Sequence, residues 1–195
     1  MVESARRGPG SYATREKLTR AAAELIAEVG WGRVTTRAVA DRAGLPHGAV
    51  SYHFRGKQEL LIDACLEVFG QAVPFEDFAA LPGLADLIDL IAVQLTEGLE
   101  SNVALTRLMF EAMREAERDD VLRERLGEMI AEYRKAVVAI VRADQQRGVL
   151  PAPLSAEGVA TVVAAVGDGL LLHALLDPGL DVTSALGTLR AMLTA

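Results

Sequence analysis

Apolar residues recur every three to four positions along most of the chain, and this spacing predicts helices. The first stripe predicts a helix that starts between residues 11 and 14 and ends at Gly30. Its inner face comprises Leu18, Ala22, Leu25, Ile26 and Val29. No stretch alternates between apolar and polar residues as a half-buried strand does. The pattern therefore predicts an all-α fold of about nine helices.

Breaks that contain Gly, Pro or Asp separate the remaining stripes, which predict the other helices. The expected ranges are 36–43, 47–53, 57 to a loop at 73, 83–101, 103–118, 119–147, 155–176 and 181–194. Ser155 is expected to cap the eighth helix. That helix is apolar almost all round, which predicts that it is buried on every side.

The second and third predicted helices are joined by the segment Ala43-Gly44-Leu45-Pro46. Gly44 accepts the positive φ of a tight turn, and Pro46 fits the first turn of the helix that follows. The third helix is too short to be stable alone, so it must pack on its neighbours. This arrangement is typical of a helix-turn-helix DNA-binding unit. The alternative is two ordinary packed helices with a solvated rim, which is disfavoured because several local features agree.

The uneven distribution of charge supports a nucleic-acid partner. Residues 1–57 hold ten Lys and Arg against five Asp and Glu, a net charge of +5. The remaining residues hold ten against twenty-two, a net charge of −12, so the overall value of −7 hides a cationic N-terminal segment. Within it, residues 1–10 are expected to form a disordered arm. Whether Arg6 and Arg7 of this arm enter a minor groove is left open.

Several classes of protein are disfavoured. The lone Cys65 excludes an internal disulfide framework, and the N-terminus lacks the apolar run of a signal peptide. The longest apolar stretch contains Asp168 and His173, which argues against a membrane span. We expect a soluble, cytoplasmic protein. No nucleophile and base stand out together, and the two histidines near the turn are six residues apart, so no enzyme activity, metal or cofactor is expected.

Two segments resemble the N-terminal domain of the TetR family of bacterial transcriptional regulators. They are TREKLTRAAAELIAEVGW and TTRAVADRAGLPHGAVSYHFRGKQELL, and the resemblance covers about residues 14–66. It implies that the chain binds DNA on the bacterial nucleoid. The base- and phosphate-contacting positions that it implies are Thr35, Arg37, Pro46, His47, Ala49, Ser51, Tyr52, His53 and Lys57.

The residue types at these positions suit DNA contacts. Ser and His bond base edges or phosphates, the Tyr52 hydroxyl reaches a phosphate, and Thr35 and Lys57 are phosphate-binding candidates at helix starts. Many family members carry an aromatic residue in place of Ser51 and a hydroxylic residue in place of Pro46 and Ala49. The operator sequence therefore does not carry over from the family.

The chain is expected to divide into the arm 1–10, a DNA-binding domain over 11–56 and an effector-binding and dimerisation domain over 57–195. The apolar helix over 155–176 has more apolar surface than one domain can cover, and the resemblance implies a homodimer through the last two helices. Two-fold symmetry then predicts a pseudo-palindromic operator. The expected interface residues are Val163, Ala164, Gly167, Leu171, Leu186 and Leu189.

The family resemblance also implies a small-molecule pocket in the C-terminal domain, and a hydrophobic effector would suit its Met and Phe side chains. The candidate lining residues are Phe69, Phe75, Phe78, Ile91, Gln94, Arg107, Met109, Met113, Met129, Tyr133, Val137, Asp168 and His173. The alternative for each apolar residue is plain core, and for Asp168 and His173 a satisfied polar group.

The leading hypothesis is a ligand-responsive repressor that a hydrophobic small molecule releases from its operator. Two alternatives stay open: a DNA-bound scaffold that recruits a protein partner without a small-molecule effector, and a local activator. The sequence specifies neither the effector nor the regulated genes.

Overall fold

The computed structural model describes residues 9–72, 78, 80–101 and 103–194 of the chain. Over these residues it contains nine α-helices and no strand, which confirms the all-α prediction. The chain divides into two compact units. Unit 1 comprises residues 1–72 and 107–123, and unit 2 comprises residues 73–106 and 124–195. The predicted boundary at residue 57 differs from this division, because α4 (Lys57–Ala72) packs along the first helix and belongs to unit 1.

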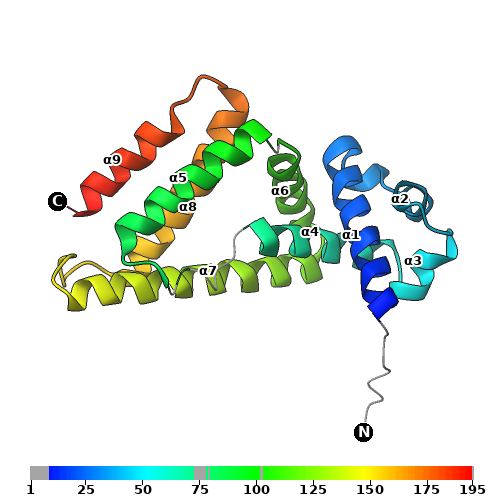
Figure 1. Cartoon of the computed structure of the whole chain (residues 1–195), viewed down its shortest axis with the longest axis horizontal. Coiled ribbons are helices and arrows are strands. Elements are labelled where there is room, and N and C mark those ends of the chain that lie inside the picture. Colours follow the sequence, from blue (N-terminus) through cyan, green and yellow to red (C-terminus); the bar gives the residue numbers. More distant parts are fainter. Residues whose placement is uncertain (1–8, 73–77, 79, 102, 195) are drawn as a thin grey trace, which may run out of the picture. The chain divides into compact units, whose positions relative to one another are not determined.

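Unit 1 is organised around α1 (Pro9–Val29), which contacts α4 most extensively and also packs on α2 (Thr36–Ala43) and α3 (Gly48–His53) (Figure 1). The predicted inner face of α1 is largely confirmed, since Leu18, Ala22 and Ile26 have no exposed surface. Val39, Val50 and Leu60 bring the other three helices into the same core. Each short helix therefore gains its stability from packing on α1 rather than from its own length.

The local turn chemistry follows the sequence closely. Gly30 has a φ of 83° and Gly44 a φ of 67°, so both adopt the left-handed region that other residues avoid. Thr35 caps α2 by accepting a hydrogen bond from the N–H of Ala38 at 3.1 Å. Three details differ from the prediction: α1 begins at Pro9, a 3₁₀ turn (η1, Trp31–Arg33) follows it, and α3 begins at Gly48.

Unit 2 is built from α5 (Leu84–Ser101), most of α7 (Asp120–Gln146), α8 (Ala156–Leu176) and α9 (Val182–Thr194). α5 packs against both α8 and α9. The remaining helix, α6 (Val103–Ala116), contributes its residues from Arg107 onward to unit 1. The core of unit 2 includes Leu87, Ile88, Val137, Val141 and Leu186.

A buried carboxylate fixes the start of α5 within unit 2. Asp144 of α7 is 2% exposed, accepts a hydrogen bond from the N–H of Leu84 at 2.9 Å and pairs with Arg147. A Cβ atom at Gly83 would lie 2.9 Å from the same carboxylate, so glycine is required by this close approach. The Asp144 carboxylate thus has both an oppositely charged partner and a hydrogen-bond donor, as a buried carboxylate needs.

The most apolar helix of the chain, α8, is long and apolar enough to cross a membrane by length and composition. One side of it packs into the core of unit 2 through Ala156, Val159, Ala160 and Val163. Ser155 caps it as predicted, accepting from the N–H of Gly158 at 3.1 Å. Only 17% of its most apolar stretch is buried, however, so the prediction of burial on every side is not met within one chain.

Candidate nucleic-acid interface

The third helix is anchored in unit 1 by its inner residues. Val50 is 2% exposed and Phe54, which follows the helix, is 3% exposed. The Phe54 N–H donates to the carbonyl of Val50 at 2.8 Å and closes the last turn. These contacts leave the opposite side of a six-residue helix facing solvent.

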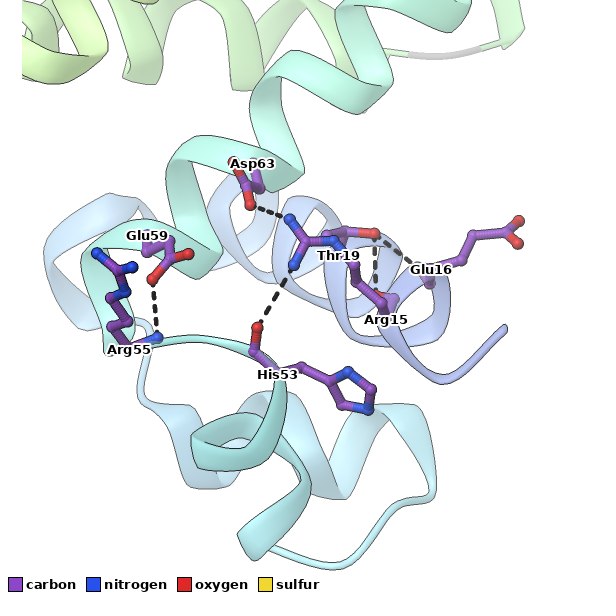
Figure 2. A network of polar contacts seen from close by, with 7 residues as sticks. All are labelled: Arg15, Glu16, Thr19, His53, Arg55, Glu59 and Asp63. Carbon is purple, nitrogen blue, oxygen red and sulfur yellow. Dashed lines mark hydrogen bonds and ion pairs between the residues drawn. The ribbon is translucent and has the colours of Figure 1, made fainter. Parts of the chain in front are cut away.

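A cation from α1 fixes the C-terminal end of α3, as Figure 2 shows. The guanidinium of Arg15 donates to the carbonyl oxygen of His53 at 3.4 Å and forms an ion pair with Asp63 of α4. Its carbon atom also lies 4.6 Å from the centre of the Phe54 ring, a cation–π contact. Arg15 thus links α1, α3 and α4. Sequence reasoning missed this role, because nothing in the spacing of α1 distinguishes Arg15 from a solvated arginine.

Most of the predicted contact residues are solvent-accessible, on α2, on α3, in the turn between them and at the start of α4. Tyr52 is 81% exposed, an unusual position for a large aromatic side chain. Ala49 and Lys57 are half-buried. The other exposed members of the predicted set are Thr35, Arg37, Pro46, His47 and Ser51.

His53 departs from this arrangement. We expected its side chain on the exposed surface of α3, but it is only 8% exposed. Its ring lies edge-on to Tyr52, with the ring centres 5.0 Å apart. That expectation was wrong because the chain leaves the helix at Phe54, which is extended and buried, and the adjacent His53 is buried with it.

The hydrogen bonds of the exposed residues define what each offers to a partner. Ser51 donates its hydroxyl proton to the carbonyl of Gly48 at 3.0 Å, so its oxygen remains an acceptor. The Thr35 oxygen accepts from Ala38, so its proton remains available for donation to a phosphate. Lys57 donates to the carbonyl of Gly32 at 3.1 Å, a neutral partner that leaves its positive charge uncompensated.

The side chain of His47 contacts a carboxylate of α2. Its Nε2 atom lies 2.7 Å from Oδ1 of Asp41, at the C-terminal half of α2. Both side chains keep more than half of their surface exposed, at 53% and 61%. Sequence reasoning did not single out Asp41.

A second polar network within unit 1 joins the DNA-binding helices to α6 and the start of α7. Glu111 of α6 accepts a hydrogen bond from the N–H of Trp31 at 2.9 Å. Gln58 of α4 donates to Asp119 at 2.6 Å and accepts from the indole N–H of Trp31 at 3.4 Å. The N–H of Leu122, which donates to Asp119 at 2.8 Å, lowers the pKa of Asp119, and Gln58 lowers it further.

The predicted effector residues do not form one group in the structure. Phe78, Ile91 and Val137 are buried in unit 2, where the Phe78 and Tyr133 rings lie 5.7 Å apart. Burial raises the pKa of Tyr133 to about 12, with a smaller contribution from Asp168. Gln94 and Met129 are half-buried in the same unit, whereas Phe69 and Met109 belong to unit 1. Phe75 lies outside the described residues.

Four of the predicted effector residues are exposed, contrary to the expectation that they face inward: Arg107, Met113, Asp168 and His173. The reason is helical geometry, since α6 and α8 bury only one side in their own unit. Asp168 nevertheless has apolar neighbours, and partial burial raises the pKa of its carboxyl.

The predicted dimer residues also require a correction. Val163 and Leu186 are 2% and 1% exposed and belong to the core of their own unit, so they offer no surface to a partner. Leu189 is half-buried against the same core, and Ala164, Gly167 and Leu171 are half-buried on α8. The exposed apolar residues of the two last helices are Val162, Leu172, Leu175, Leu176 and Met192.

A helix-turn-helix with an exposed, cation-flanked second helix, followed by a helical unit with a bare apolar face, defines the class of two-unit DNA-binding regulators. Comparison with protein families agrees. Residues 18–70 match the family of bacterial regulatory proteins named tetR, and residues 85–195 match the C-terminal domain of BetI-type transcriptional repressors. The chain belongs to the TetR family of bacterial transcriptional regulators. No curated protein matches it.

Solved structures share the fold over nearly the whole chain. A TetR-family regulator from Rhodococcus sp. has a TM-score of 0.82 at 20% identity, covering 94% of this chain and 100% of that one. The transcriptional regulator SCO7518 from Streptomyces coelicolor A3(2) is 26% identical, with a TM-score of 0.73 and coverages of 93% and 99%. FadR from Bacillus subtilis, solved with stearoyl-CoA, is 19% identical, with a TM-score of 0.77 and coverages of 92% and 97%.

Proposed function

We propose that this TetR-family chain acts in the bacterial cytoplasm as a homodimeric repressor of a pseudo-palindromic operator and that a hydrophobic small molecule releases it. The observation that carries the DNA-binding part is the solvent-facing side of α3. There, Tyr52 is 81% exposed, next to exposed residues able to donate to and accept from bases and phosphates. Arg37 and Lys57 supply positive charge beside it.

The DNA-binding surface is tested by selecting duplexes from a randomised pool and then measuring affinity against salt. Affinity is expected to fall steeply as salt rises, because phosphate contacts release counterions. Tyr52→Ala and Lys57→Ala should lower the affinity for all duplexes alike, since phosphate contacts carry no sequence information. Selection of no duplex at low salt would contradict the proposal.

The homodimer is supported by the bare apolar side of α8. From residue 161 onward, exposed residues recur along α8 at the spacing of a helix face. They are mostly apolar (Val162, Ala165, Leu172, Leu175 and Leu176), with Thr161, Asp168 and His173 among them. An apolar helix face of this length is costly to leave in water, and a second copy of the same helix pair would cover it. Two chains related by a two-fold axis would place two α3 helices on one duplex.

The effector is proposed to enter unit 2 near Tyr133, where an aromatic pair and apolar side chains surround a phenol hydroxyl. The relative bound to stearoyl-CoA supports a long apolar ligand, and we use stearoyl-CoA as the probe. Addition of stearoyl-CoA is expected to dissociate a complex of the chain with a selected duplex. Tyr133→Leu is expected to raise the stearoyl-CoA concentration that this dissociation requires. A complex unaffected by stearoyl-CoA and by free stearate would contradict a long-chain acyl effector.

A reporter distinguishes repression from activation. A promoter that contains the selected duplex is expected to lose expression when the chain is produced in the same cell. A rise in expression would identify an activator instead.

A further inference from the structure

The segment between Trp31 and Lys57 contains five Lys and Arg but a single acidic residue, Asp41. A carboxylate is unfavourable on a surface that faces phosphates. Asp41 is nevertheless exposed, and its Oδ1 lies 2.7 Å from Nε2 of His47. We therefore ask what the contact with His47 contributes that offsets the repulsion between Asp41 and the phosphates.

The backbone holds the two side chains together. Asp41 and His47 are separated by the turn, in which Gly44 adopts a φ of 67° and the N–H of Leu45 donates to the carbonyl of Ala40 at 2.9 Å. The N–H of Ala49 donates to Pro46 at 2.8 Å and fixes the start of α3. Because this turn is already ordered, little additional entropy is lost when the pair forms.

The neighbouring cation does not compete for Asp41. Arg42 is directed toward α1, where it pairs with Glu28 at 2.7 Å and with Glu24 at 3.2 Å. Among the described residues, His47 is thus the side chain that contacts Asp41.

The chemistry of the pair restricts what His47 offers to DNA. An ionised carboxylate only accepts hydrogen bonds, so Nε2 of His47 must carry the proton that it donates to Asp41. In the neutral ring, the other nitrogen, Nδ1, then has a lone pair and no proton. His47 stands immediately before α3, at the end of a recognition helix that contacts base edges.

We propose that Asp41 is a specificity-determining residue: it orients His47 and fixes its tautomer, so that Nδ1 accepts a hydrogen bond from a base in the major groove. The bases with an amino donor there are adenine, through N6, and cytosine, through N4. Guanine presents only acceptors at N7 and O6, and thymine presents O4 and a methyl group. Each base pair carries one such amino group, so the chain selects the orientation of the pair that places adenine or cytosine on the strand that His47 contacts. The inference rests on the proposed DNA-binding function and specifies how that site chooses its sequence.

The experiment measures affinity at pH 8 for a selected duplex and for its three base variants at each half-site position. His47→Ala identifies the contacted position as the one at which discrimination is lost. The wild type is expected to discriminate there by roughly tenfold in favour of adenine or cytosine. Asp41→Ala should reduce this to less than about threefold, leave the other positions unchanged, and add nothing when combined with His47→Ala.

Two further variants separate positioning from charge and folding. Asp41→Asn keeps an oxygen acceptor for Nε2 and should retain the base preference. Because it removes a negative charge, it should raise the affinity for all duplexes alike. Glu16→Ala is the matched control, because it removes a carboxylate from an exposed pair with Arg20 on α1, at 2.7 Å. It should leave every base preference unchanged.

The possible outcomes distinguish this inference from the function on which it rests. Guanine selected at the His47 position, or full discrimination in Asp41→Ala, overturns the role of Asp41 while DNA binding stands. Preferences that are unchanged in His47→Ala overturn the inference in the same way, since His47 then contacts no base. A chain that binds no selected duplex contradicts the proposed function itself.

Discussion

At the scale of single residues, Arg15 carries more of the DNA-binding geometry than its place in the sequence indicates. Its guanidinium contacts the carbonyl of His53 and the carboxylate of Asp63 (Figure 2). It also lies over the ring of Phe54. The Asp63 side chain is only 12% exposed, so this ion pair is partly shielded from water. Arg15 therefore adds a polar link between α1, α3 and α4 to the apolar packing of Val50 and Phe54.

We expect Arg15→Ala to lower the free energy of unfolding by about 2 kcal/mol, because a partly buried, charge-assisted set of hydrogen bonds is lost. Urea denaturation measures the change. Arg20→Ala is the control, since its pair with Glu16 is exposed on both sides and should contribute less than about 0.5 kcal/mol. Equal effects of the two substitutions would show that Arg15 is an ordinary surface arginine.

Tyr133 allows a prediction on pH. Burial raises its pKa to about 12, so the folded chain holds the phenol proton more tightly than the unfolded chain, whose value is about 10. The resulting stability is fully present below pH 10 and is lost as the pH rises toward 12. In a spectrophotometric titration, a late tyrosinate phase should be present in the wild type and absent in Tyr133→Phe. Loss of an early phase instead would contradict the burial of Tyr133.

At the scale of elements, the junction of α6 and α7 is tied to the DNA-binding helices within unit 1. Asp119 caps α7 through the N–H of Leu122 and accepts from Gln58 of α4. Gln58 in turn accepts from Trp31, the single tryptophan of the chain. Hydrogen bonds between named side chains therefore connect the α6–α7 junction to η1 and α4.

The charge on Asp119 contributes stability that depends on pH. Its pKa is lowered in the folded state, so the contribution is present above the ordinary value of 3.8 and is lost as the pH falls through the lower value. Asp119→Ala should cost about 1 kcal/mol at pH 7, as the loss of a helix cap does. Urea denaturation at pH 7 and at pH 3 should show the difference from wild type shrinking in acid. A difference that is equal at both pH values would contradict this role of the charge.

Gln58→Ala should leave the Trp31 indole N–H without its side-chain acceptor. The fluorescence of the single tryptophan then reports directly on this junction, and its emission maximum should shift relative to the wild type. Lys57→Ala is the control, since Lys57 contacts the carbonyl of Gly32 and not the indole. An unchanged Gln58→Ala spectrum would mean that the indole does not depend on Gln58.

At the scale of the whole molecule, the exposed side of α8 is the surface on which the proposed homodimer rests. Leu172 and Leu176 are 43% and 76% exposed on the most apolar helix, although the other side of the same helix is packed in a core. A partner copy would remove this surface from water and fix the distance between two α3 helices.

Leu172→Glu should therefore convert the protein to single chains of 20.8 kDa, as measured by light scattering. Its DNA affinity should fall, and the slope of affinity against salt should be roughly halved, because one half-site is contacted instead of two. Val149→Glu places the same charge at a residue that is 53% exposed outside α8 and α9, and should change neither property. If Leu172→Glu keeps the mass of the wild type, α8 is not the interface.

The sequence by itself determined the elements of this protein and the type of its N-terminal unit. Helical periodicity, the Thr35 and Ser155 caps and the positive φ of Gly44 are local effects, because each depends on residues within a few positions of one another. The exposed position of Tyr52 followed from the same periodicity. Family membership likewise followed from a short, locally specific segment.

The tertiary structure alone decided which face of each helix is covered and which distant residues meet. It buried His53 with Phe54, placed Val163 and Leu186 in the core of their own unit, and left Met113 in solvent. Arg15 lies 48 residues from Asp63, and Gln58 lies 61 residues from Asp119. Periodicity gives a helix an apolar side, but a helix as apolar as α8 has no marked side. Only packing against α5 decides which of its residues remain for a partner.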